Sequence, residues 1–220
     1  KPDLRFGMEI QNITEVFKDT EFTVFKNVIE EGGIINAIVV KDVADKYSRK
    51  DLDKLTDYVK TYKASGLAYL KFNEEISGSI AKVTSDEEKA ELINKLSLEE
   101  NDLVLIVADN KDVTNASLAF LRNTLGKELG LIDPNKFNFL WVVDWPLFEY
   151  NEEEGRYEAA HHPFTSPKDG DEDKLLTDKA NCYSRAYDLV LNGYELLSGS
   201  VRIHDNETQS KVFEAIGLTI

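Results

Sequence analysis

Apolar residues in the last third of the chain form two short runs that meet at Asn192-Gly193. An Asn-Gly pair between alternating apolar positions is the strongest short sequence signal for a two-residue β-hairpin turn. The run therefore predicts two antiparallel strands joined at this turn. The expected cross-strand pairs, counted outward from the turn, are Leu191 with Tyr194, Val190 with Glu195, and Asp188 with Leu197.

Two acidic residues of this hairpin are expected on the same face of the sheet. Asp188 and Val190 share a face because side chains alternate along a strand. Glu195 lies opposite Val190, so it joins them as a diagonal neighbour of Asp188. Two converging carboxylates repel each other unless a cation lies between them, and such a pair suits Mg²⁺ that carries a phosphate substrate. The alternative interpretation is a solvated sheet face with two unrelated acids.

Arg202 follows the hairpin and is a candidate anion-binding residue. It lies seven positions after Glu195, an odd offset that would place it on the opposite face of a regular strand. A glycine within a strand often marks a bulge, so a bulge at Ser198-Gly199 would bring Arg202 to the carboxylate face. Its planar guanidinium suits a carboxylate or a phosphate. A surface ion pair is the alternative role.

Residues 25–131 alternate strand-like and helix-like patterns, which indicates an α+β or α/β arrangement. Ser48 precedes a helical run and forms a capping box with Asp51, and Ser85 precedes a second helix. The third helix is expected to bury a stripe of Ala116, Phe120 and Leu125. The expected strands span 34–40, 67–72 and 103–107, and the second and third helices span 86–96 and 113–129.

From residue 138 onward the pattern changes to strands and turns. Residues 139–143 form a nearly continuous apolar strand, and an acidic Asn-Glu-Glu-Glu-Gly turn predicts an exposed hairpin over 149–157. Residues 167–173 have the composition of a loop, and a helix is expected over 206–216.

Composition narrows the classes of protein. The 220 residues are 42% apolar, as in an ordinary globular core, and the single Cys182 excludes an internal disulfide and a cysteine-based zinc site. The chain has no long apolar run, so we expect no membrane span and a cytoplasmic location. The net charge of −15 argues against a chain whose main surface binds nucleic acid.

Four blocks of sequence resemble bacterial-type aspartyl-tRNA synthetases, which are class II enzymes. They are Lys1-Pro-Asp-Leu-Arg5, the run Phe139–Phe148, Ala160-His-His-Pro-Phe-Thr165 and the run Asn192–His204. The resemblance extends over essentially the whole chain. It implies an α+β fold: part of a class II antiparallel-sheet core, at 1–24 and 132–220, with an inserted two-layer α+β GAD-like domain at 25–131.

The resemblance also implies an enzymatic function for the parent protein, an aspartate–tRNA ligase. Such an enzyme activates aspartate with ATP and Mg²⁺ to aspartyl-adenylate and transfers aspartate to tRNA. The chain resembles a central fragment that lacks the class II signature motifs, so we expect it to be inactive by itself. The parent is expected to be a homodimer and to contact tRNA mostly through parts outside this chain.

Specific roles follow from the same resemblance. Arg202 would bind the side-chain carboxylate of aspartate and, with Glu195, contribute to catalysis. Glu195 and Asp188 would bind ATP phosphates and Mg²⁺, and Ser200 would line the pocket floor. His161 and His162 match a paired-histidine block near the bound amino acid. Adjacent strand residues face opposite ways, so these two histidines are not expected to ligate one metal.

One departure from the family pattern concerns the site. Three consecutive glycines usually follow the position of Glu195, whereas this chain has Leu196-Leu-Ser198-Gly199. Glycine permits close approach of backbone to a ligand. The larger side chains would either narrow the adenylate pocket or point away from it.

Two other functions are compatible with the sequence. In the first, the chain is a non-catalytic module whose GAD-like domain docks on tRNA or on a partner protein. In the second, it derives from a class II relative that uses asparagine or lysine; the context of Arg202 and the GAD-like insertion argue against this.

Overall fold

The computed structural model describes residues 1–218, and their packing divides the chain into two compact units. The insertion unit is Phe6–Asp133, and the hairpin unit consists of Lys1–Arg5 and the chain from Pro134 onward. The sequence placed the first boundary at residue 24, whereas the insertion unit begins at Phe6. No helix among residues 1–218 has the length and apolar character needed to cross a bilayer.

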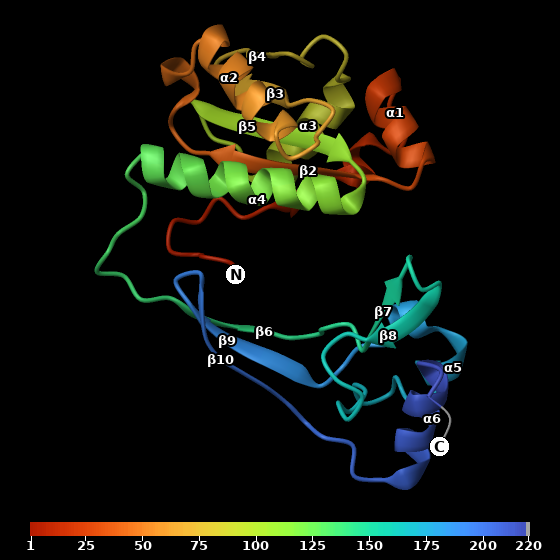
Figure 1. The fold of residues 1–220 in the computed structure, drawn as a ribbon. Helices are drawn as coiled ribbons and strands as arrows, with labels where there is room; N and C mark the ends of the chain where they lie inside the picture. The colour runs from red at the N-terminus through yellow and green to blue at the C-terminus, as the bar shows by residue number, and fades with distance from the viewer. Residues whose placement is uncertain (219–220) are drawn as a thin grey trace. The chain divides into compact units, whose positions relative to one another are not determined.

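A five-stranded antiparallel sheet forms the centre of the insertion unit (Figure 1). Its strand order is β1-β2-β5-β3-β4, so the long strand β5 lies in the middle. The predicted strands are all present. The strands are β1 (Gln11–Asn12), β2 (Ile34–Val40), β3 (Ala68–Phe72), β4 (Ile76–Gly78) and β5 (Asp102–Asp109).

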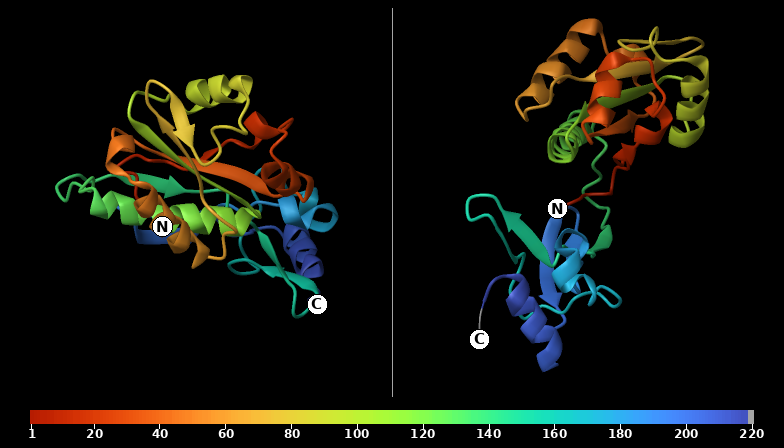
Figure 2. Two further views of the ribbon diagram at one scale, coloured as in Figure 1. Left: turned by 90° about the horizontal axis from the view of Figure 1, so that it is seen from above. Right: turned by 90° about the vertical axis from the view of Figure 1, so that its right-hand side faces the viewer.

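The α+β class is confirmed, and helices cover both faces of this sheet (Figure 2), so the insertion unit has three layers where two were expected. Along β5, Leu103 and Leu105 belong to one buried cluster, with α2 and α4, whereas Val104 and Ile106 belong to a second cluster, with α1 and α3. Strands that are buried on both faces lack the alternation of apolar and polar residues that indicates a sheet covered on one face only. The helices are α1 (Thr23–Glu30), α2 (Arg49–Lys60), α3 (Asp86–Leu96) and α4 (Lys111–Glu128), with 3-10 turns η1 (Thr14–Phe17) and η2 (Ala44–Lys46).

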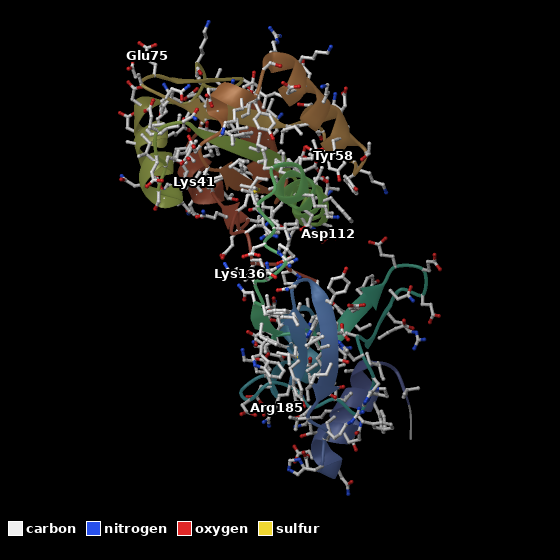
Figure 3. The ribbon with its side chains drawn as sticks, turned by 90° about the vertical axis from the view of Figure 1, so that its left-hand side faces the viewer. Lys41, Tyr58, Glu75, Asp112, Lys136 and Arg185 are labelled. Atoms are coloured by element: carbon white, nitrogen blue, oxygen red, sulfur yellow. The ribbon has the colours of Figure 1, made fainter. Side chains whose placement is uncertain are left out.

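Local signals for the helix starts are confirmed. Ser48 and Asp51 form the predicted capping box of α2, and Ser85 forms a second box with Glu88 at the start of α3. Each box satisfies backbone N–H groups that a helix cannot pair internally. Acidic side chains of this unit, such as Glu75 and Asp112, project from its surface (Figure 3).

The predicted apolar stripe of α4 is wrong in part. Leu125 is buried, but Phe120 is 48% exposed and stacks on Tyr62, with 4.3 Å between ring centroids. The buried face instead consists of Thr114, Ser117, Leu118, Leu121, Arg122 and Leu125. Small polar residues are therefore part of the buried face of α4, and hydrophobicity alone predicted the wrong buried face for this helix.

The segment before α1 belongs to the insertion unit because its side chains complete the core. Ile13 and Phe17 are fully buried in the cluster beside α3. Arg122 of α4, which is 5% exposed, fixes the preceding backbone by donating hydrogen bonds to the carbonyls of Gly7 (2.6 Å) and Met8 (2.8 Å). Its guanidinium also lies 4.1 Å from the centroid of the Phe6 ring.

The hairpin unit contains two small antiparallel sheets. The first has the order β10-β9-β6, and the second is the predicted hairpin β7-β8. A cluster of buried residues beside α5 and α6 includes Leu175, Val212 and Ala215. The elements are β6 (Phe139–Val142), β7 (Phe148–Asn151), β8 (Arg156–Ala159), α5 (Lys174–Thr177), η3 (Lys179–Asn181), β9 (Ala186–Leu191), β10 (Tyr194–Ser200) and α6 (Asn206–Ala215).

The hairpin at Asn192-Gly193 is confirmed, but one pair and the bulge are corrected. Both turn residues have positive φ, as the two-residue turn requires. Leu191 pairs with Tyr194 and Val190 with Glu195 as expected. The bulge lies between Glu195 and Leu197, earlier than predicted. Asp188 therefore pairs with Ser198 rather than with Leu197.

Candidate functional site

The register of the hairpin gathers the predicted polar residues on one face of the β10-β9-β6 sheet. Glu195 pairs with Val190, Ser198 with Asp188, and Ser200 with Ala186. Paired residues share a face, and so do alternate residues along β9. Asp188 and Glu195 consequently face the same way, as the sequence predicted, and the bulge between Glu195 and Leu197 places Ser200 on that face as well.

A cation does lie between the two carboxylates, and it is the Lys1 ammonium. Lys1 Nζ forms a very short contact with Asp188 and lies 3.1 Å from Oε2 of Glu195. The hydrogen bond to Asp188 raises the pKa of Lys1 above its ordinary value. Asp188 is only 5% exposed. Among the described residues, no group of three or more acids, histidines or cysteines is placed to hold a metal ion. A metal ion at this face would therefore take its protein ligands from Asp188 and Glu195 and its remaining ligands from the substrate.

Residues 161–165 form a loop whose backbone is hydrogen-bonded to the segment that follows β10. The amide of Ser166 donates to Val201, and the amide of Ile203 donates to Phe164. These bonds flank an isolated antiparallel bridge between Thr165 and Arg202. The loop is thereby fixed beside Arg202, which explains how residues 40 positions apart in the chain come together.

The Arg202 guanidinium is exposed and is oriented by a histidine rather than by an acid. Its Nη1 lies 2.8 Å from Nδ1 of His162. The amide of Phe164 donates to the same Nδ1 at 3.0 Å. Because both neighbours are donors, Nδ1 must be the acceptor, so His162 is neutral with its proton on Nε2. Arg202 has no carboxylate partner among residues 1–218.

The other predicted residues occupy distinct places. His161 is exposed, and its ring meets the edge of Trp145 with 5.5 Å between centroids. Within residues 1–218 it forms no hydrogen bond with Arg202. Thr165 was not predicted as a site residue; it is 1% exposed, and its buried hydroxyl has no hydrogen-bond partner in the described part of the chain. An isolated threonine carries no sequence signal, and only its bridge to Arg202 identifies it.

Lys1 is the second residue that sequence reasoning missed. It belongs to the Lys1-Pro-Asp-Leu-Arg5 block, which contributed to the resemblance but received no role. Its distance in sequence from the hairpin, 187 positions to Asp188, hides the contact from any local pattern.

The residues that replace the family glycines divide between the two faces. Leu197 pairs with Leu189 and so points away from the acids, whereas Ser198 shares their face. Gly199 lies under the ring of Tyr187, where an added Cβ would be 2.8 Å from the phenol oxygen. Glycine is thus retained where a neighbouring aromatic ring covers the backbone.

A hollow of about 280 Å³ in the same unit contains none of the predicted residues. Its lining includes Asp144, Lys168 and Arg185, and Lys168 pairs with Asp144 at 2.5 Å. These charged groups are already paired, so the exposed Arg202 and the acid pair are better candidates for ligand binding.

The pKa of His162 provides a direct test of its contact with Arg202. Burial and the Arg202 charge lower that pKa below the ordinary value of about 6.5. The neutral imidazole therefore contributes stability above about pH 6.5, and this contribution is lost as the pH falls toward the lowered value. Nuclear magnetic resonance titration should show His162 titrating below the ordinary value.

Replacing Arg202 with Gln should raise the His162 pKa toward the ordinary value, because one cause of the shift is removed. Arg185→Gln is the control and should leave the titration unchanged, since Arg185 pairs with Asp169. An identical titration in the Arg202 variant would show that the two groups do not interact in solution.

Comparison with known proteins gives a consistent result along the whole chain. Residues 25–118 match the GAD domain family. The 220 residues are 56% identical to an aspartate–tRNA ligase of Macrococcus caseolyticus and 54% identical to that of Enterococcus faecalis. They are 52% identical to an aspartate–tRNA(Asp/Asn) ligase of Anoxybacillus flavithermus. In each case all of this chain aligns with 37% of the relative's length.

The GAD match lies within the insertion unit, and the acid pair, His162 and Arg202 lie in the hairpin unit. Residues 25–118 therefore match the GAD domain, and the chain is similar, over its whole length, to a part of the aspartate–tRNA ligases.

Proposed function

We propose that the hairpin unit forms part of the aspartate and ATP site of an aspartate–tRNA ligase. The whole enzyme joins aspartate to ATP, releases pyrophosphate and transfers aspartate to tRNA. The observation that carries this proposal is the Arg202 guanidinium, which is exposed, held by a neutral histidine and has no carboxylate partner among the described residues.

Arg202 has the chemistry to read the side chain of aspartate. A guanidinium donates two parallel hydrogen bonds to a carboxylate, whereas an amide offers one oxygen and an NH₂ group that repels the donors. His162 accepts from Nη1 and so fixes the plane of the guanidinium. We assign His162 to this positioning role, His161 to the amino-acid side of the pocket, and Ser200 to the face that carries the acids.

The acid pair fits a hard divalent cation. Glu195 and Asp188 supply oxygen donors that already converge on a positive group, and Mg²⁺ is commonly held by one or two carboxylates together with substrate phosphates. When bound, Mg²⁺ neutralises phosphate charge during adenylate formation. No protein base is needed, because the reacting aspartate carboxylate is ionised at neutral pH. The chain's residues contribute by positioning and by electrostatics.

The remaining partners belong to the whole enzyme. We propose that tRNA contacts lie mostly outside this chain, since its net charge of −15 disfavours phosphate binding. We also propose a homodimeric, cytoplasmic parent protein. The charge equally disfavours the alternative function of a non-catalytic module that docks on tRNA.

The test is a calorimetric titration of the chain with non-hydrolysable aspartyl-adenylate and asparaginyl-adenylate analogues in the presence of Mg²⁺. We expect the aspartyl analogue to bind at least 10-fold more tightly, because its carboxylate pairs with Arg202. A lysyl-adenylate analogue is the control for binding through the adenosine alone. Absence of binding, or equal affinity for all three analogues, would contradict the proposal.

A further inference from the structure

The cation position of the acid pair is filled by a side chain of the same chain. Lys1 Nζ contacts both Asp188 and Glu195, and it also lies 4.5 Å from the centroid of the Trp145 ring. Only 27% of the Lys1 side chain is exposed. Three separate groups thus hold this ammonium on the face that carries the predicted metal ligands.

The Lys1 ammonium offsets the electrostatic cost of burying Asp188. Asp188 is buried, and an isolated buried carboxylate is strongly disfavoured without a positive partner. The ammonium supplies that charge and holds Glu195 close to Asp188. The two acids therefore keep their converging geometry when no metal is bound.

The same ammonium must interfere with a metal. A divalent cation that binds both carboxylates would lie within a few ångströms of Lys1 Nζ, where like charges repel strongly in a partly buried site. The carboxylate oxygens that Lys1 uses are also those that would ligate the metal. Simultaneous occupation would leave Lys1 repelled and without its hydrogen bonds.

We propose that Lys1 is the resident counter-cation of the Asp188–Glu195 pair and that it exchanges with Mg²⁺. The inference rests on the proposed role of these acids in holding Mg²⁺. Lys1 keeps the pair assembled before the nucleotide arrives and sets the free-metal affinity low. Mg²⁺ that arrives with ATP phosphates has additional ligands and can displace the ammonium, whereas free Mg²⁺ competes with it poorly.

Trp145 determines where the ammonium goes after the exchange. A cation over an aromatic face retains part of its stabilisation when it loses a carboxylate partner. The ring therefore keeps the displaced Lys1 beside the acid pair. Lys1 is a positioning residue in this scheme.

The test is a titration of the chain with Mn²⁺, followed by electron paramagnetic resonance of the free ion. Lys1→Met should bind Mn²⁺ at least 10-fold more tightly than the unmodified chain, because a competing charge is removed. Lys211→Met is the matched control: it removes the same charge from the same unit, but Lys211 pairs with Glu207 on α6. The affinity of Lys211→Met for Mn²⁺ should stay within 2-fold of that of the unmodified chain. Adding Asp188→Asn to Lys1→Met should abolish the tighter binding.

A second measurement needs no variant and so does not depend on the folding of one. In the unmodified chain, the Cε resonances of Lys1 should shift during a Mg²⁺ titration with the same midpoint as Mg²⁺ binding, while those of Lys211 stay fixed. Equal or weaker Mn²⁺ binding by Lys1→Met, absence of binding in all variants, or unmoved Lys1 resonances at saturation would each overturn the proposal.

The Mn²⁺ titration and the adenylate-analogue titration test the two proposals separately. If the adenylate analogues bind with the expected preference but Lys1→Met does not tighten Mn²⁺ binding, only the role of Lys1 is lost. If Lys1→Met tightens Mn²⁺ binding while the analogues bind equally, the exchange stands and the aspartate site is refuted.

Discussion

Arg202→Met is expected to weaken binding of the aspartyl-adenylate analogue at least 100-fold. The substitution removes two charge-assisted hydrogen bonds to the ligand carboxylate, which together contribute about 3 kcal/mol. It also removes the cation that opposes protonation of His162. The stem of methionine resembles that of arginine, so the loop at 161–165 keeps its packing. Calorimetric titration of both chains measures the loss.

The ligand comparison separates recognition from general damage. The asparaginyl analogue has no carboxylate for Arg202, so its affinity should change much less, and the preference for aspartate should collapse in the variant. The preference of Arg202→Lys for the aspartyl analogue should lie between those of the unmodified chain and Arg202→Met. An ammonium keeps the positive charge but lacks the planar guanidinium that binds a carboxylate with two hydrogen bonds.

The control for this experiment is Arg185→Met. Arg185 is another exposed arginine of the hairpin unit (Figure 3), and its backbone neighbours the start of β9. Its side chain pairs with Asp169 at 3.4 Å. Arg185→Met should bind the analogues with the same affinity as the unmodified chain. If Arg202→Met retained the preference for the aspartyl analogue, another group would be responsible for selectivity.

Arg122→Met should lower the free energy of unfolding of the insertion unit by about 3 kcal/mol. The buried guanidinium binds the carbonyls of Gly7 and Met8 and packs on the Phe6 ring. Without it, two carbonyl groups lose their charged donor. Hydrogen exchange measured by mass spectrometry on β5 peptides should accelerate roughly 100-fold, since each 1.4 kcal/mol corresponds to about a tenfold change.

Lys127→Met is the matched control on the same helix. Lys127 is exposed in the last turn of α4 and should contribute only a few tenths of a kcal/mol. Equal effects of the two substitutions would show that Arg122 acts through its charge alone and does not fix the segment at Phe6.

The positions of most strands and helices were predictable because their signals are local. Ser85 with Glu88, and Asn192 with Gly193, specify a helix start and a hairpin turn through bonds and dihedral angles within four residues. The predicted strand at 34–40 coincides with β2. Such features depend little on the rest of the molecule.

The orientation of elements was less predictable. Phe120 was expected in the core, but it stacks on Tyr62 at the surface, while Thr114 and Ser117 are fully buried. The strands of a sheet that is covered on both faces also lack an alternation of apolar and polar residues, so the sequence does not reveal how many layers of helices pack on the sheet. The choice between faces was made by neighbours that are distant in sequence.

The same division holds for the candidate site. Strand periodicity and the Asn-Gly turn were enough to predict that Asp188 and Glu195 lie on one face. The position of the bulge, the contact of His162 with Arg202, and the position of Lys1 between the acids became clear only from the folded chain. These depend on contacts across 40 to 187 positions, which chain folding creates and which no local pattern encodes.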